Sequence, residues 1–105
     1  MNHKPEYSVS VDLAVSEKML SHVGFLAKVS VIAAERLYDM LDESIAALEN
    51  NPKIYPHYIP QEPVDAELRF KMCGRRYRIV FEIIGNSVFV YDIQDCRQDV
   101  DKNLV

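Results

Sequence analysis

The chain has 105 residues, the size of a single domain, and 49% of them are apolar while 27% are charged. This mixture excludes a disordered or low-complexity chain. The apolar runs reach only four or five residues, whereas a membrane-spanning helix needs about 20. The net charge of −4 also argues against a general nucleic-acid coat protein.

The N-terminal residues and the cysteines indicate a cytoplasmic protein. Residues 1–6 are polar, and no apolar signal-peptide core follows them. We therefore expect one domain over residues 1–105, with 1–6 and 100–105 as flexible tails. Two cysteines could form only one disulfide, which would stabilise a chain of this size little. We therefore expect Cys73 and Cys96 to be reduced thiols.

Charge is distributed unevenly along the sequence. Residues 35–67 carry eight acids and two bases, whereas residues 68–80 carry five bases and no acid. Exposed charges act only over about 8–10 Å at physiological salt, so this local field matters more to an approaching anion than the total charge does. The basic stretch is either an anion-binding surface or a solvated strand edge that discourages aggregation.

The first half of the chain predicts a strand and two helices. Residues 7–13 alternate apolar and polar side chains, which indicates a half-buried strand. Ser16 is placed to cap a first helix that ends near residues 28–30, and Ser30 to cap a second helix over 33–49. The second helix has one apolar stripe, made of Ala34, Leu37, Tyr38, Leu41, Ile45 and Leu48.

The second half predicts a loop and three strands. Four prolines make residues 52–63 a surface loop. Four apolar side chains in it are expected to fold back on the core: Ile54, Tyr55, Tyr58 and Ile59. Strands follow over 68–72, 77–84 and 87–93, and the strand over 77–84 is apolar enough to be central.

This order predicts an α+β fold with a β-α-α-β-β-β two-layer sandwich. The helical hairpin must bury its apolar stripes, and one face of a twisted, mainly antiparallel sheet is the surface large enough to receive them. The uncovered face is then left for function. We expect the cations of the basic stretch to gather there.

The sequence resembles toxins of the RelE/ParE superfamily from bacterial type II toxin–antitoxin modules. The resemblance covers most of residues 7–99. It rests on the strand followed by a helical hairpin, on Ala46-Ala47-Leu48-Glu49-Asn50-Asn51-Pro52, and on the proline-rich loop. It rests most on Gly74-Arg75-Arg76-Tyr77-Arg78-Ile79-Val80-Phe81-Glu82-Ile83 leading to Val88-Phe89-Val90-Tyr91-Asp92-Ile93, and on Asp95-Cys96-Arg97-Gln98-Asp99.

The resemblance implies a cytoplasmic toxin of the plasmid-stabilisation kind, held inactive by a cognate antitoxin, with a heterotetramer of the two as one expected assembly. RelE-like members enter the ribosome and cut mRNA without a metal or cofactor. ParE-like members keep the fold and inhibit DNA gyrase instead. A third reading is a non-toxic protein-binding module that has kept the fold.

RNA cleavage by a 2′-hydroxyl needs cations around the phosphate, and the resemblance supplies them. By motif position Arg78, Arg97 and Lys71 are the expected catalytic residues. Arg69 and Lys71, two apart on one strand, share a face. The expected phosphate-binding residues are Arg69, Lys71, Arg75 and Arg76, and the planar guanidinium of arginine can hold two phosphate oxygens at once.

The acid and base of the reaction are less clear in the sequence. RelE-like nucleases carry a Tyr or His several residues beyond the position of Arg97, but residues 98–105 contain neither. Four residues are candidate substitutes: His57, Tyr77, Tyr91 and Glu82. Placement in a loop is the better explanation for His57, and packing in the core or sheet for Tyr77 and Tyr91. Cross-strand pairing explains Glu82 as well as a role as base does. The cysteines and histidines lack zinc-ligand spacing, so no metal is expected.

Overall fold

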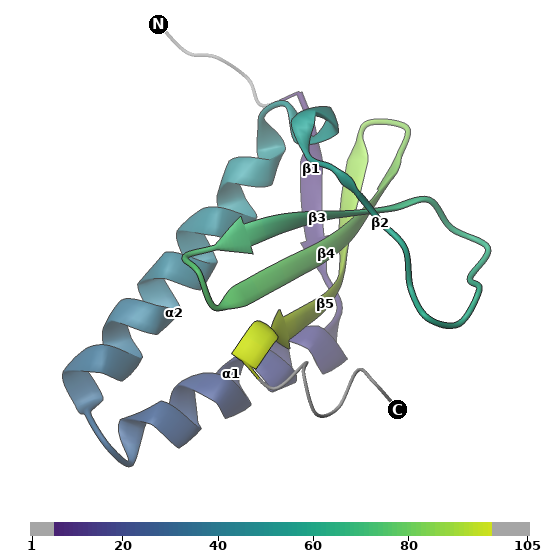
Figure 1. The fold of residues 1–105 in the computed structure, drawn as a ribbon. Coiled ribbons are helices and arrows are strands. Elements are labelled where there is room, and N and C mark those ends of the chain that lie inside the picture. The colour runs from purple at the N-terminus through teal and green to yellow at the C-terminus, as the bar shows by residue number, and fades with distance from the viewer. Residues whose placement is uncertain (1–5, 98–105) are drawn as a thin grey trace, which may run out of the picture.

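The computed structural model describes residues 6–97 and forms two layers, a pair of helices and a five-stranded sheet (Figure 1). The helices are α1 (Leu13–Ala27) and α2 (Val31–Ala46), followed by two short 3₁₀ turns, η1 (Ala47–Glu49) and η2 (Pro52–Ile54). The strands are β1 (Ser8–Val11), β2 (His57–Tyr58), β3 (Leu68–Cys73), β4 (Tyr77–Ile84) and β5 (Ser87–Asp95). No helix in this part of the chain is long and apolar enough to cross a membrane.

The sheet has the strand order β1-β5-β4-β3-β2. β1 runs parallel to β5, and the other three pairings are antiparallel. The predicted α+β sandwich and its mainly antiparallel sheet are therefore confirmed, as is the central place of β4. Gly85 forms the turn between β4 and β5 with a φ of 60°, a conformation that favours glycine.

The core lies between the helices and one face of the sheet. The stripe of α2 contributes Ala34, Leu37, Leu41 and Ile45, all buried, and Leu48 of η1 continues it. On the sheet, the buried partners of this stripe come from three strands: Cys73, Tyr77, Ile79, Phe81, Val88, Val90 and Ile93. Tyr38, which was predicted to share the stripe, is instead 40% exposed.

The helix starts are partly as predicted. Ser30 caps α2, because its hydroxyl oxygen accepts a hydrogen bond from the Ala33 amide at 3.1 Å. Ser16 does not cap α1. The helix begins at Leu13, and the Asp12 carbonyl already accepts the Ser16 amide at 3.0 Å, so Ser16 lies within the first turn.

The proline-rich segment is more structured than the sequence predicted. After Asn51, which adopts a left-handed conformation with φ 55°, the chain forms η2 and then β2, which pairs with the start of β3. Tyr55 packs edge-on against Phe81, with ring centroids 6.0 Å apart. Ile54 and Ile59 do not fold back on the core, because they are 66% and 87% exposed.

Truncation of Leu41 tests this core. The side chain is fully buried between α2 and the sheet, so Leu41→Ala is expected to lower the free energy of unfolding by about 2–5 kcal/mol, since a cavity adds to the lost burial. Val31→Ala, on the same helix but 62% exposed, is expected to change it by less than about 0.5 kcal/mol. Urea unfolding followed by circular dichroism measures both. Equal losses would contradict the packing described here.

Candidate functional site

Arg69 and Lys71 share one face of β3, as predicted, but it is the face that the helices cover. The Lys71 Nζ donates to the Ser44 carbonyl of α2 at 2.9 Å, and the Arg69 Nη1 donates to the Tyr55 carbonyl at 2.7 Å. The last carbonyls of a helix lack donors within the helix, and Ser44 lies in the last turn of α2. The expectation that these two cations line the uncovered face is therefore wrong.

The alternation of side chains along β3 explains why the two cations lie on the covered face. Cys73 is buried on the same side as Lys71, and its thiol contacts the Met40 carbonyl at 3.4 Å. Leu68 is buried on the opposite side, where Tyr58 and Pro60 line a small hollow with it. Tyr58 of β2 and Pro60 in the loop after it thus lie beside Leu68, on the face of β3 opposite to Lys71.

Arg78 lies on the uncovered face, opposite to Lys71. Its Nε and Nη2 donate to the Gln94 Oε1 at 2.8 and 2.6 Å. The guanidinium also lies over the rings of Tyr58 and Phe70, at 5.2 and 5.9 Å from their centroids. The structure therefore separates Arg78 from Lys71 by the thickness of the sheet.

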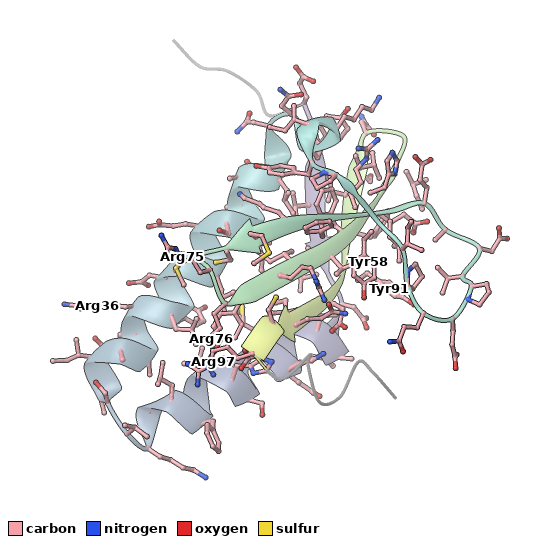
Figure 2. All side chains as sticks on the ribbon, in the orientation of Figure 1. Arg36, Tyr58, Arg75, Arg76, Tyr91 and Arg97 are labelled. Carbon is pink, nitrogen blue, oxygen red and sulfur yellow. The ribbon has the colours of Figure 1, made fainter. Side chains whose placement is uncertain are left out.

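Three of the predicted cations lie at the same end of the sheet, beside the helices. Arg75 and Arg76 lie in the β3–β4 turn, which Gly74 opens with a φ of 65°. Arg97 follows β5. Figure 2 shows Arg75, Arg76 and Arg97 together with Arg36 of α2 on this side of the molecule, whereas Tyr58 and Tyr91 lie away from them.

An ion pair joins this turn to β5. The Arg76 Nε and Nη2 donate to the two carboxylate oxygens of Asp95 at 3.1 and 2.8 Å, a bidentate contact. The Asp95 side chain is 1% exposed. Its Oδ1 also accepts the backbone amide of Arg97 at 3.1 Å. The hydrogen bonds from Arg76, followed by the one from the Arg97 amide, hold the pKa of Asp95 below its usual value despite burial.

A cleft of about 400 Å³ opens beside this ion pair, between α1 and the ends of β4 and β5. We call it the His22 cleft. His22 of α1 lines it together with Arg76, Tyr77, Asp95 and Arg97. The His22 and Tyr77 rings meet edge-on with centroids 5.6 Å apart, and the Arg76 guanidinium lies 5.2 Å from the Tyr77 centroid.

The imidazole of His22 is in an unusual state. Among the described residues, no hydrogen-bond partner reaches its buried Nε2. Burial, and then the nearby Lys18 charge, lower its pKa from 6.5, so the ring is neutral at neutral pH and can accept a proton. Burial likewise raises the pKa of Tyr77, which keeps its hydroxyl protonated.

His22 was missed in the sequence. The available signal was its position: it falls on the same helical stripe as Val15, Met19 and Leu26, which places its ring against the sheet. The stripe alone gives no reason to prefer a functional histidine to a packed one. The contact with Tyr77 and the nearby Arg97 supply that reason.

The other acid–base candidates lie elsewhere. His57 is on the edge strand β2, exposed and 3.3 Å from the Glu67 carboxylate. Glu82 pairs across the sheet with Phe89 in the register of β4 and β5. Tyr91 lines the small hollow near Tyr58. Of the four predicted substitutes, only Tyr77 lines the His22 cleft, and residues 98–105 lie outside the described part of the chain.

Metal ligands and thiols add nothing further to this site. Within residues 6–97, no three His, Cys, Asp or Glu side chains are grouped as a metal site would require. Within the same residues, neither Cys73 nor Cys96 is part of a disulfide. No known protein-family model matches the sequence, and no curated protein is significantly similar to it.

The lowered pKa of His22 makes folding stability depend on pH. Below about pH 6.5 the unfolded chain binds a proton on His22, whereas the folded chain binds it only at lower pH. The free energy of unfolding is therefore highest above about pH 6.5 and declines as the pH falls below that value. His22→Gln, which cannot titrate, is expected to flatten this decline. Asp95 contributes only at lower pH, below the usual carboxyl pKa of 3.8.

Urea midpoints measured from about pH 7.5 to 5 test this expectation. Ser21→Ala, at the neighbouring position in the same cleft, is the matched control and should keep the decline of the wild type. If the wild type and His22→Gln lose stability in parallel, the buried neutral imidazole is not the cause.

Proposed function

We propose that this protein is the toxin of a type II toxin–antitoxin module with the RelE/ParE fold, and that it cuts mRNA on the ribosome. The observation that carries the proposal is the His22 cleft. It brings Arg97, which the resemblance puts at the scissile phosphate, together with a neutral histidine and a protonated tyrosine. The strand, helical hairpin and three-stranded meander in this order support the fold assignment.

Three residues of the cleft have a chemical role in this proposal. His22 accepts the proton of the attacking 2′-hydroxyl, which bonds to the neighbouring phosphorus while the bond to the 5′ oxygen breaks. Arg97 stabilises the charge that develops on the phosphate. Tyr77 provides the proton for the departing 5′ oxygen, and the products are a cyclic phosphate and a 5′-hydroxyl.

Arg76 has a supporting role. Its guanidinium is engaged with Asp95 and lies against Tyr77, so it fixes the wall of the cleft and the backbone of Arg97. Removing Arg76 would leave the buried carboxylate without its partner. Arg97 is therefore the better residue for a test of activity.

Substitution of Arg97 tests the proposal. Arg97→Ala is expected to lower transcript cleavage by about 100-fold, as the loss of one charge-stabilising donor does in other enzymes, and to relieve growth arrest on induced expression. Lys53→Ala removes an exposed cation of η2 and should leave both unchanged. Mapping transcript 5′ ends, with and without translation, provides the measurement. Full cleavage by Arg97→Ala would exclude this cleft as the active site.

Substitution of His22 tests the proton transfer. His22→Gln is expected to lower the cleavage rate at least about 100-fold and to remove the rise of the rate through the pKa of His22 as the pH increases. The rate of cleavage on programmed ribosomes, measured across pH, distinguishes this from misfolding, because a merely structural loss would not change the shape of the profile. An unchanged profile would remove His22 from the mechanism.

One observation favours a second function. Arg69 and Lys71 are held by backbone carbonyls on the covered face, so the cations that the resemblance groups around a phosphate are divided between two faces. A gyrase inhibitor, or a non-toxic protein-binding module, has no need for that group. Growth arrest with intact transcripts and inhibited supercoiling would indicate the gyrase inhibitor, and absence of arrest the binding module.

The partner expected in this proposal is a cognate antitoxin. A neighbouring reading frame whose product relieves growth arrest would identify it. The ribosome and its mRNA are the expected target in the nuclease reading, and DNA gyrase in the alternative.

A further inference from the structure

The turn between α1 and α2 projects beyond the sheet and carries exposed apolar side chains (Figure 1). We call residues 25–32 the hairpin tip. Phe25, Val29 and Ile32 are 72%, 83% and 65% exposed, and Val31 is exposed as well. Single exposed apolar side chains are ordinary, but four of them within one short segment are typical of a surface that binds another molecule.

The four apolar side chains lie on different sides of the hairpin tip. Phe25 and Val29 line the His22 cleft. Ile32 lines a hollow beside the β3–β4 turn, and Val31 lines a third hollow between the two helices. A folded partner protein would cover one of these sides and leave the others in water. The interface of a lipid bilayer surrounds an inserted segment and removes all four side chains from water together.

Positive charge lies around the hairpin tip. The sequence has no acidic residue over 18–34. Lys28 lies in the tip itself, Arg36 and Arg75 line the hollow beside the β3–β4 turn, and Arg97 lines the His22 cleft (Figure 2). Within residues 6–97, no ion pair neutralises any of these four cations. The tip therefore combines apolar side chains with charges that attract anionic groups.

The spacing of these residues matches the layers of a membrane surface. Arg36 follows Ile32 by four residues on α2, which is about 6 Å along the helix axis. Interfacial segments bury their apolar side chains about 5–10 Å into the boundary between lipid headgroups and acyl chains. With Ile32 at that depth, the Arg36 guanidinium lies at the level of the lipid phosphates. Glu35 and Asp39 line the hollow beside Val31, so the side of Arg36 faces the headgroups more closely.

We infer that the hairpin tip inserts into the surface of a bilayer that contains anionic phospholipid. The four apolar side chains enter the boundary with the acyl chains, and Lys28, Arg36 and Arg75 contact the phosphates and anionic headgroups. Attachment is peripheral, because no helix in the described part of the chain is long and apolar enough to cross a membrane. The inference is independent of the proposed cleavage of mRNA.

Co-sedimentation of the full-length protein with lipid vesicles tests the inference. The vesicles contain phosphatidylcholine alone, or phosphatidylcholine mixed with phosphatidylglycerol. We expect binding to the anionic mixture to be at least about tenfold stronger, since several basic side chains lie at the level of the headgroups. The net charge of −4 opposes adsorption of the rest of the protein to such vesicles.

Two matched pairs of variants locate the binding surface. Ile32→Ser should weaken binding by about tenfold, whereas Ile54→Ser, on η2 and 66% exposed, should leave it unchanged. Arg36→Gln should weaken binding to the anionic vesicles by about fivefold and leave binding to phosphatidylcholine unchanged. Lys53→Gln, an exposed cation of η2, is its control. Thermal melting of each variant confirms that it is folded.

Tryptophan fluorescence reports insertion directly, because the chain contains no tryptophan of its own. With Val29→Trp, the emission is expected to shift to shorter wavelength on the anionic vesicles and to be quenched by lipids brominated in their acyl chains. With Ile54→Trp, neither change is expected.

The inference fails if neither kind of vesicle binds the protein, or if Ile54→Ser weakens binding as much as Ile32→Ser. It also fails if Arg36→Gln weakens binding while Ile32→Ser does not and the Val29→Trp emission stays unshifted, since this indicates adsorption by charge alone. Self-association in sedimentation velocity that Ile32→Ser abolishes, without vesicle binding, would make the tip a contact between copies of this chain.

Discussion

The bidentate ion pair between Arg76 and Asp95 is the interaction on which the end of the molecule with the His22 cleft depends. It connects the β3–β4 turn to the last residue of β5, and the same carboxylate fixes the amide of Arg97. A buried carboxylate is stable only when it is fully paired, so this contact holds the β3–β4 turn and the end of β5 together along the sheet side of the His22 cleft. Arg76 also lies over the ring of Tyr77, and the Tyr77 and His22 rings meet at 67° with centroids 5.6 Å apart. The cleft is thus built by one charge pair and the rings packed beside it.

The sequence predicted correctly which layers pack together, because buried side chains recur at regular intervals along each element. The stripe of α2 and the apolar run of β4 specify which faces meet, and the glycine turns specify where strands reverse. The edge of the sheet was harder to predict. On β3 the alternation identified two faces but not which one the helices cover, because a loop buries Leu68 while helix-end carbonyls accept Lys71. The brief strand β2 has too few residues to show any period.

The candidate site was predicted in part for a related reason. Motif position identified Arg97, and the sequence also offered Arg76 as a phosphate-binding residue and Tyr77 as a substitute acid or base. These three are close in the fold because the β3–β4 turn and the end of β5 are neighbours. His22 comes from a helix far away in the sequence, and only the packing of α1 on the sheet brings it there. Arg69, Lys71 and Arg78 are near the others in sequence but are oriented by the strand alternation, which sends them to different faces. Basic residues that are close together in the sequence therefore need not lie close together in the fold.

A single measurement addresses the central claim, that the His22 cleft is the functional surface. A library of all single substitutions is expressed in cells, and the survivors of growth arrest are sequenced. We expect surviving substitutions at exposed or half-exposed positions to concentrate at His22, Arg97 and the other residues that line the cleft. If they concentrate instead on the uncovered face, at Phe70, Arg78 and Tyr91, the cleft is not where this protein acts. If the unmutated chain causes no arrest, the toxin proposal itself is excluded.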